Sequence, residues 1–179
     1  MNKGTTGAGE LIARITHLEM LAPPAHRVQM PMGPRLAVLR ATDMPAAFYR
    51  YLYRQVGKAH HWLLRRDLPD GELLPLIHST STEIQVLYVD GSPAGFFELD
   101  LSRLPGEAEI IYFGLTPDFQ GRGLARFFLS EAVFAAWAHQ PQRLVIHTNT
   151  LDSPRALQLY QRIGFSPYAF SEETVEPWL

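Results

Sequence analysis

The sequence predicts a single α/β domain in which helices pack against a sheet that contains an antiparallel meander. Its 179 residues, 46% of them hydrophobic, suit one globular unit with a substantial core. Residues 83–115 contain three runs of strand-forming residues separated by turn residues, which indicates neighbouring strands. Downstream of them, two segments with helical periodicity flank a continuous apolar run of the kind that helices bury on both faces.

Composition excludes several functional classes. A net charge of −2 at pH 7 argues against a general nucleic-acid binder, so an anionic ligand would have to be held locally. The absence of cysteine excludes disulfides, thiolate metal sites and a cysteine nucleophile, and it is compatible with a reducing cytoplasm. The sequence has no apolar stretch that fits a signal peptide or the roughly 20 residues of a membrane span. We therefore expect a cytoplasmic protein that acts without a membrane or a nucleic acid.

The first residues are expected to form an N-terminal extension, residues 1–34, ahead of the main domain, residues 35–179, with both in one globular unit. The extension has one candidate strand at residues 15–20, where apolar and polar residues alternate. The segment after this strand is rich in proline, which interrupts regular elements, so we expect a loop there.

The main domain is predicted to begin with a strand at residues 35–41 and a helix over about residues 44–57. Thr42 or Asp43 is the expected N-cap of that helix. A second, short helix is expected over residues 72–78. Helical spacing gives the first helix one apolar face made of Phe48, Tyr49, Leu52, Tyr53 and Val56, which we expect to pack in the core.

The predicted meander is built around a hairpin. Its turn is Asp90-Gly91, and these residue types accept the positive φ angles that tight hairpin turns require. A third strand follows and is stopped by Pro117. The three strands together predict an antiparallel arrangement.

The last part of the chain alternates helices and strands. Residues 121–139 are predicted to form a long amphipathic helix, and residues 143–149 a buried strand. Ser153 is the expected N-cap of the next helix, and Gly164 its C-terminal stop. Residues 165–170 form the last predicted strand.

The segment QGRG, residues 120–123, stands between a strand and a helix and predicts an anion-binding turn. The first turn of a helix has N–H groups without partners, and the helix dipole adds positive potential, so phosphate binds where the backbone is accessible. Gly121 and Gly123 have no side chains to block that approach, while Arg122 and Arg126 add charge. A turn that serves packing alone would have the same residues. The Walker and dinucleotide patterns both fail here, the second because Arg126 replaces a small residue.

This segment makes the chain resemble the GCN5-related N-acetyltransferases (GNAT). The family's acetyl-CoA motif, Gln/Arg-x-x-Gly-x-Gly/Ala, is matched by Gln120, Gly123 and Ala125. A second family motif, Asn-x-x-Ala-x-x-x-Tyr-x-x-x-Gly-Phe, follows in the right order. Its matched positions are Ala156, Tyr160, Gly164 and Phe165.

The second motif departs from the family at its first position. Ser153 stands where the family has asparagine, so the cofactor contact made there is altered or is shifted to Asn149. The resemblance covers about residues 83–170, and the first 80 residues carry no motif of the family.

The resemblance implies a mixed, mainly antiparallel twisted sheet flanked by helices, whose fourth and fifth strands splay apart to admit acetyl-CoA. Acetyl-CoA would be the co-substrate, and no ligand spacing in the sequence supports a metal. The residues that the resemblance assigns to the cofactor are Phe113, Leu115, Gln120, Gly121, Arg122, Gly123, Leu124, Ala125, Asn149 and Ser153.

Acetyl transfer to an amine requires a base, because an alkyl amine with a pKa of about 10.4 is mostly ammonium at neutral pH. Glu109 lies on the strand that leads to the phosphate loop, where some relatives carry a glutamate base, and it is the first candidate, directly or through water. A solvated residue or an ion pair would explain it equally well. Glu98, on the preceding strand, is the alternative base, although its alternating sequence also fits a side chain that faces solvent.

The departing thiolate needs a proton or stabilisation. Tyr160 occupies the family's tyrosine position and is implied to be the general acid; packing of its helix on the sheet is the alternative role. A backbone N–H around Phe113 to Leu115 would polarise the thioester carbonyl.

Several polar and aromatic residues are candidates for the acceptor site. His60, His61 and Trp62 follow the first helix, in a region that commonly shapes this site in the family, and Tyr49 and Tyr53 would join them. Ordinary surface and core residues would have the same pattern. His147, at the end of an apolar strand, is interpreted as a structural histidine.

The sequence therefore predicts direct acetyl transfer from acetyl-CoA to a primary amine, with Glu109 as base and Tyr160 as acid. A non-catalytic CoA-binding or regulatory module of the same fold, and an acyltransferase that uses a longer acyl-CoA, are the alternatives. The acceptor is open among a small-molecule amine, an aminoglycoside-like compound, a peptide N-terminus and a protein lysine. Exposed edge strands make a homodimer plausible.

Overall fold

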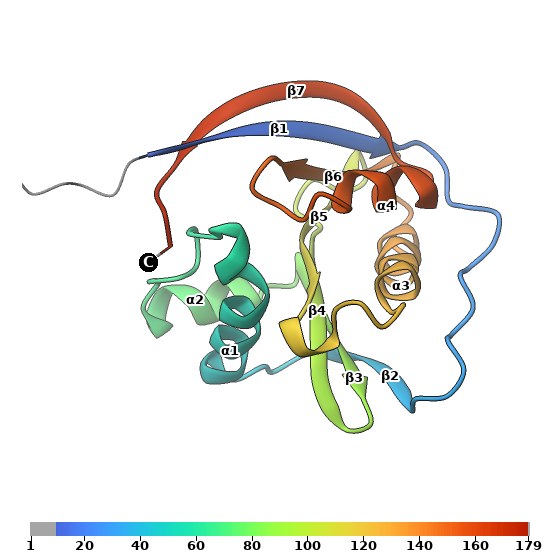
Figure 1. The fold of residues 1–179 in the computed structure, drawn as a ribbon, viewed down its shortest axis with the longest axis horizontal. Helices are drawn as coiled ribbons and strands as arrows, with labels where there is room; N and C mark the ends of the chain where they lie inside the picture. The colour runs from blue at the N-terminus through green and yellow to red at the C-terminus, as the bar shows by residue number, and fades with distance from the viewer. Residues whose placement is uncertain (1–9, 179) are drawn as a thin grey trace, which may run out of the picture.

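One twisted sheet organises the protein, with its seven strands in the order β2-β3-β4-β5-β6-β1-β7 (Figure 1). The computed structural model describes residues 10–178; residues 1–9 of the expected N-terminal extension, and residue 179, lie outside the described residues. The strands are β1 (Leu11–Met20), β2 (Leu36–Ala41), β3 (Thr82–Val89), β4 (Ser92–Asp100), β5 (Glu107–Leu115), β6 (Arg143–Asn149) and β7 (Ser166–Val175). The helices are α1 (Ala46–Gly57), α2 (Asp70–Ile77), α3 (Ala125–Trp137) and α4 (Ala156–Ile163), with short 3₁₀ turns η1 (Lys58–His60) and η2 (Pro117–Phe119).

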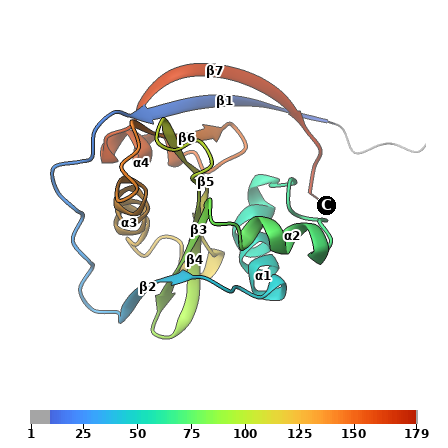
Figure 2. The same cartoon turned by 180° about the vertical axis from the view of Figure 1, so that it is seen from behind.

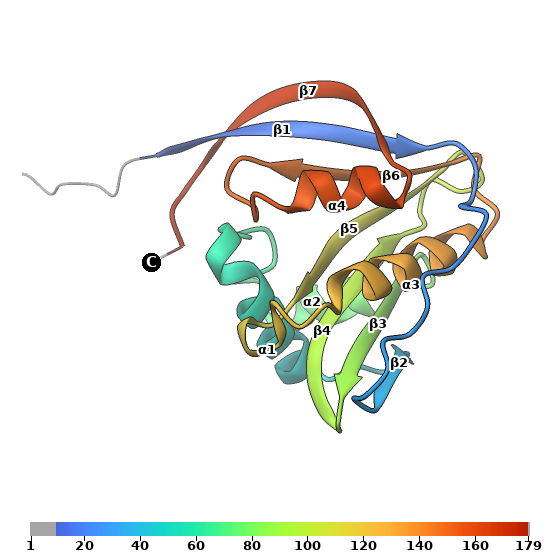
Figure 3. The ribbon, with the colours of Figure 1, turned by 45° about the vertical axis from the view of Figure 1, so that its right-hand side comes forward.

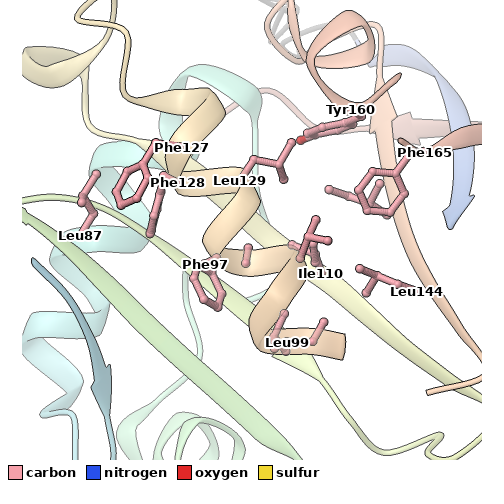
Figure 4. Close-up of a cluster of buried hydrophobic side chains, with 14 of the residues drawn as sticks. Leu87, Phe97, Leu99, Ile110, Phe127, Phe128, Leu129, Leu144, Tyr160 and Phe165 are labelled. Carbon is pink, nitrogen blue, oxygen red and sulfur yellow. The ribbon is translucent and has the colours of Figure 1, made fainter. Parts of the chain in front are cut away.

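Helices cover both faces of the sheet. α1 and α2 pack on one face, and α3 and α4 pack on the other, as the view from behind in Figure 2 also shows. Side chains of β4 alternate between the two cores: Phe96 lies with Tyr49 of α1, whereas Phe97 stacks at 5.4 Å from Phe128 of α3. Figure 4 shows the core on the α3 side. β4 is therefore buried on both faces.

The predicted meander is confirmed. β3, β4 and β5 pair antiparallel in sequence order. In the β3–β4 turn, Asp90 and Gly91 have φ angles of 48° and 87°, the positive values that a tight hairpin turn demands.

The splay expected between the fourth and fifth strands is present, but in the chain order of this protein it lies between β5 and β6, because the strand β1 adds one to the count and β4 pairs with β5. β5 and β6 are parallel, but they pair only from Glu107 to Ile110 on β5 and from Arg143 to Ile146 on β6. β5 then continues to Leu115 and β6 to Asn149 without pairing to each other. All other neighbours in the sheet are antiparallel, so the sheet is mixed and mainly antiparallel.

The strand expected at residues 15–20 is longer and takes an unexpected place. β1 begins at Leu11 and inserts between β6 and β7, antiparallel to both. The last strand is also longer than predicted, because β7 extends to Val175 along β1. Figure 3 shows the two strands arching together beyond β6, with which β1 pairs along most of its length. The arch supplies one wall of the cavity described below.

Helix α3 begins later than predicted, at Ala125 instead of residue 121, and ends at Trp137 instead of residue 139. The reason is in the backbone of the preceding turn. Gly121 and Gly123 have φ angles of 71° and 75°, which a right-handed helix cannot contain.

The predicted caps of α1 and α4 are wrong. α1 begins after Pro45, so neither Thr42 nor Asp43 caps it. Met44 precedes a proline and is therefore disfavoured in the helical region, which prevents the helix from starting at residue 44. α4 begins at Ala156 with Arg155 as its N-cap instead of Ser153. The short helix expected over residues 72–78 is α2, which begins two residues earlier, at Asp70, and ends at Ile77.

Candidate active site

A cavity of about 630 Å³ opens where β5 and β6 separate. Its walls come from β5 and β6, from the arch of β1 and β7, and from the η1 turn with residues 61–64. Four of the residues predicted for catalysis or cofactor binding line it, namely Glu109, Phe113, Asn149 and Tyr160.

The QGRG turn forms an open backbone cradle at the start of α3. A Cβ atom built on Gly121 or Gly123 would meet no atom within 4 Å. α3 has no side-chain cap, so the N–H groups of its first turn are available to a ligand. Gln120 Nε2 donates to the carbonyl oxygen of Leu115 over 3.2 Å, which ties the turn to the end of β5. The cradle has the space and the donors that a pyrophosphate requires.

The side chains around the cradle leave its mouth open. Leu124 is buried and anchors the turn in the core, and Ala125 adds only a methyl group. Arg122 and Arg126 are exposed, and the guanidinium of Arg122 lies 4.8 Å from the ring centroid of Phe119. Positive charge is therefore present beside the cradle without filling it.

The outer half of β5 offers backbone donors to the gap between the strands. The N–H of Thr116 donates to the carbonyl of Ala94 over 2.8 Å, which shows which N–H groups of β5 point toward β4. Because hydrogen bonds alternate in direction along an antiparallel strand, the N–H groups of Phe113 and Leu115 point away from β4. Pairing with β6 ends at Ile110, so these groups face the gap.

Glu109 lies on β5 in a cluster of charged side chains. Its Oε2 accepts a hydrogen bond of 2.7 Å from Arg103 Nη2, and its Oε1 lies 3.4 Å from His147 Nδ1. Burial raises the pKa of Glu109, but hydrogen bonds and positive charge from His147 and Arg103 lower it by more, so the net pKa is below the ordinary value. The carboxylate stays ionised at neutral pH and is a weak base by itself.

His147 is the functional candidate that sequence reasoning missed. The hydrogen bond with Glu109 raises the pKa of His147, with burial acting in the opposite direction. Its Nε2 has no hydrogen-bond partner among residues 10–178, and its side chain is 42% exposed on the cavity. Strand register brings the two residues together: Val145 pairs with Glu109 on the parallel strand, and residue 147 lies on the same face as Val145. No pattern in the sequence indicates this register.

Glu98, the alternative base, lies on the other side of the sheet in a buried ion pair. Its side chain is 0% exposed and accepts hydrogen bonds from the Tyr49 hydroxyl, at 2.7 Å, and from Arg65. Burial raises the pKa of Glu98, although Arg65 lowers it in part. The expectation that this residue faces solvent is wrong, because helices cover both faces of β4. Glu98 has no exposed surface from which to meet an acceptor.

Tyr160 lies on α4 at the cavity, and Figure 4 shows it beside Phe165. Its ring meets Phe113 and Phe165 edge to face, at 6.5 and 6.3 Å. Burial raises the pKa of Tyr160 far above its ordinary value, so the hydroxyl keeps its proton at neutral pH. That hydroxyl has no hydrogen-bond partner among residues 10–178 and is not sealed from solvent, so it is free to donate to a ligand.

α1 and the segment after it contribute another wall of the cavity. His60, His61, Trp62 and Tyr53 all line the cavity, whereas Tyr49 is buried with Glu98. Trp62 and Tyr53 pack against each other at 5.6 Å between ring centroids, which makes this wall partly aromatic.

The two candidates beyond β6 are placed differently. Asn149 lines the cavity, but its Oδ1 already accepts a hydrogen bond of 2.8 Å from the N–H of Leu151. Ser153 is exposed outside the cavity lining, and its hydroxyl accepts a long hydrogen bond of 3.4 Å from the N–H of Arg155.

Two further findings concern the part of the chain that the structure describes. None of its helices combines the length and the apolar character needed to cross a membrane. Within residues 10–178, no three histidine, aspartate or glutamate side chains gather in a group that could hold a metal ion.

Comparison with known protein families gives a match over most of the chain. The family model described as the acetyltransferase (GNAT) family matches residues 41–165. An uncharacterised N-acetyltransferase of Methanocaldococcus jannaschii is 28% identical over 140 residues, which are 74% of this chain and 54% of that protein. The chain thus spans about half the length of this curated relative.

Solved structures with the same fold include acetyltransferases. A putative GNAT-family acetyltransferase from Novosphingobium aromaticivorans has a TM-score of 0.62 and 17% identity, over 97% of this chain and 68% of that one. An aminoglycoside acetyltransferase from an uncultured soil sample, in complex with sisomicin, has a TM-score of 0.58 and 15% identity, over 72% of this chain and 87% of that one. At these identities the likeness is one of fold alone.

Proposed function

This chain belongs to the GNAT acetyltransferase family, and we propose that it transfers the acetyl group of acetyl-CoA directly to a primary amine, without a covalent enzyme intermediate. The observation that carries the proposal is the cavity at the β5–β6 splay, where an unpaired strand edge meets Glu109 and Tyr160. This arrangement supports the proposal because a carboxylate and a phenol lie at the same cavity as backbone donors without a strand partner.

Binding of acetyl-CoA is assigned to the cradle and the strand edge. Backbone N–H groups of residues 121–125 bind the pyrophosphate, with Arg122 adding charge and Gln120 holding the turn to β5. The free N–H groups of β5 bind the pantetheine arm and polarise the thioester carbonyl. Acetyl-CoA supplies a thioester whose C–S bond breaks as the amine nitrogen forms its new C–N bond. The residues assigned to the arm are Phe113, Leu115 and Asn149, whereas Ser153, which is exposed outside the cavity lining, is left out of this assignment.

Removal of the amine proton is assigned to Glu109 acting through His147. His147 Nε2 takes the proton, and the Glu109 carboxylate, 3.4 Å from Nδ1, stabilises the imidazolium that forms. The lowered pKa of Glu109 argues against that residue taking the proton alone.

Protonation of the leaving sulfur is assigned to Tyr160. Its raised pKa keeps the phenol protonated until charge develops on the sulfur, and its hydroxyl has no hydrogen-bond partner within the described residues. A general acid of this kind also stabilises the thiolate by hydrogen bonding before the proton moves.

Acetylation of a panel of primary amines, followed by mass spectrometry and by thiol release, tests the proposal. Glu109→Gln and Tyr160→Phe are each expected to lower kcat by roughly 100-fold or more while the Kd for acetyl-CoA stays unchanged. Matched controls are Glu131→Gln on α3 and Tyr51→Phe on α1, since neither residue lines the cavity. Full turnover in both active-site variants would refute the assigned roles, and no turnover with any amine would refute the proposed reaction.

A further inference from the structure

A second cavity, of about 620 Å³, lies beside the active-site cavity and is bordered by arginines. We call it the arginine pocket and define it by Arg50, Arg54, Arg65, Arg66, Tyr53 and Trp178. Its four arginines are a quarter of the 16 lysines and arginines in a chain whose net charge is −2. So much positive charge in one hollow of a mildly acidic protein calls for an explanation.

Two of these arginines have unused donors. Arg66 uses its Nε for a 2.7 Å hydrogen bond to Asp67, and Arg50 uses its Nη2 for bonds to the Leu68 carbonyl, at 2.6 Å, and to Asp70, at 2.7 Å. A guanidinium has five N–H donors, so most of those on Arg50 and Arg66 have no partner within residues 10–178.

The charge of the pocket is not fully compensated by its neighbours. Three of the four arginines form ion pairs: Arg65 with Glu98, Arg50 with Asp70 and Arg66 with Asp67. Arg54 is exposed in the last turn of α1 and forms no ion pair in the described part of the chain. Asp67, the acidic residue of the lining, is 74% exposed and is paired with Arg66, so Arg54 is the pocket arginine left without a carboxylate partner in the described residues.

A thin aromatic wall separates the arginine pocket from the active site. The ring of Tyr53 lines both cavities. His61, which lines the active site, accepts a hydrogen bond of 2.9 Å from the N–H of Trp178, which lines the pocket. The centroids of the Tyr53 and Trp178 rings are 6.2 Å apart. Tyr53 and the hydrogen bond between Trp178 and His61 therefore form a boundary that the two cavities share.

We infer that the arginine pocket binds an acidic group, a carboxylate or a phosphate, on the amine acceptor itself. The inference rests on the proposed function and narrows its substrate class to amines that also carry an acid, such as ω-amino acids and aminoalkyl phosphates. Planar guanidinium groups pair with both acids through two parallel hydrogen bonds. The acceptor places its amine near His147 and its acid near Arg54.

The test compares three series of straight-chain amines of matched length: ω-amino acids, aminoalkyl phosphates and alkylamines without an acid. The KM for acid-bearing amines is expected to be about tenfold lower than for the corresponding alkylamine, and Arg54→Gln is expected to remove that advantage with little change in kcat. The Arg54 variant is expected to leave the KM of the alkylamines unchanged, because they have no acid for the pocket to bind. A preference for one acid series identifies which of the two acids the pocket receives.

The control is Arg162→Gln, which also removes an exposed arginine from the last turn of a helix, on α4 and away from the arginine pocket. Isothermal titration of the same acid-bearing amines in the absence of acetyl-CoA gives a readout that does not depend on turnover. Saturable binding that is lost in Arg54→Gln but retained in Arg162→Gln supports the inference even if no amine is acetylated, in which case the proposed reaction alone fails. Equal KM values across the three series, or binding that is insensitive to Arg54→Gln, overturns the inference and leaves the proposed reaction standing.

Discussion

Replacing Arg65 by methionine tests whether Glu98 is a structural residue. Glu98 is 0% exposed, and its partners are Arg65 and the Tyr49 hydroxyl. Methionine keeps much of the aliphatic volume of Arg65 but leaves the carboxylate in the core without a countercharge. Breaking a buried pair in this way costs about 3–5 kcal/mol of unfolding free energy. In a chain of this size the midpoint of thermal unfolding should fall by roughly 6–20 °C.

The loss should depend on pH in a definite direction. The pKa of Glu98 is already raised in the folded protein, chiefly by burial, and removing the positive charge of Arg65 raises it further. A carboxyl with a raised folded-state pKa contributes most to stability in its protonated form, and that contribution is lost as pH rises through the folded-state pKa. The variant should therefore lose more stability at about pH 7.5 than at about pH 5.

Urea unfolding of the parent and variants at both pH values measures the effect. Arg40→Met is the matched control, because Arg40 is exposed and lies 3.9 Å from Glu83, and its removal should cost less than about 1 kcal/mol. The double variant with Glu98→Gln should recover part of the loss, because no buried charge remains. A loss below about 1 kcal/mol in Arg65→Met, or a loss independent of pH, would refute the reasoning.

Two further predictions follow from the core and the active site. Phe128→Ala, at a fully buried position against Phe97, should cost about 3–5 kcal/mol in urea unfolding, and a loss under about 1 kcal/mol would contradict the packing described. The kcat/KM of acetyl transfer should rise with pH through the raised pKa of His147, since only the neutral imidazole accepts a proton. Glu109→Gln removes the hydrogen bond that raises this pKa, so the rising limb of the pH profile should move to lower pH; a limb that stays in place would exclude His147 as the group that titrates.

Features encoded by adjacent residues were predictable from the sequence. The Asp90-Gly91 hairpin depends on local backbone preferences and has the positive φ angles expected of it, and the glycines of QGRG predicted an open turn before α3, although not where that helix begins. The buried face of α1, including Tyr49 and Leu52, follows from helical spacing alone. In each case the residues that decide the structure lie within a few positions of one another.

Features that depend on distant contacts were not predictable in the same way. The contact between Glu109 and His147 arises because β5 and β6 are adjacent in the sheet, and no local pattern in either strand indicates it. The insertion of β1 between β6 and β7 likewise depends on pairing between the two ends of the chain. The alternation around Glu98 suggested exposure, but the second helical layer over β4 buries it.

Binding of acetyl-CoA at the QGRG turn is the central claim, and a thermal-shift titration tests it most directly. At 100 times its Kd, a ligand stabilises by about 2.7 kcal/mol, which should raise the unfolding midpoint by roughly 5–10 °C. Gly123→Glu should abolish that shift, because the new side chain fills the cradle and its negative charge repels the pyrophosphate. Gly91→Glu, at an equally open glycine with positive φ in the β3–β4 turn, should retain it. A shift in the parent and in the Gly91 variant, but not in the Gly123 variant, is the predicted result. No shift in the parent, or an equal shift in all three proteins, would contradict the assignment of the turn as the pyrophosphate site.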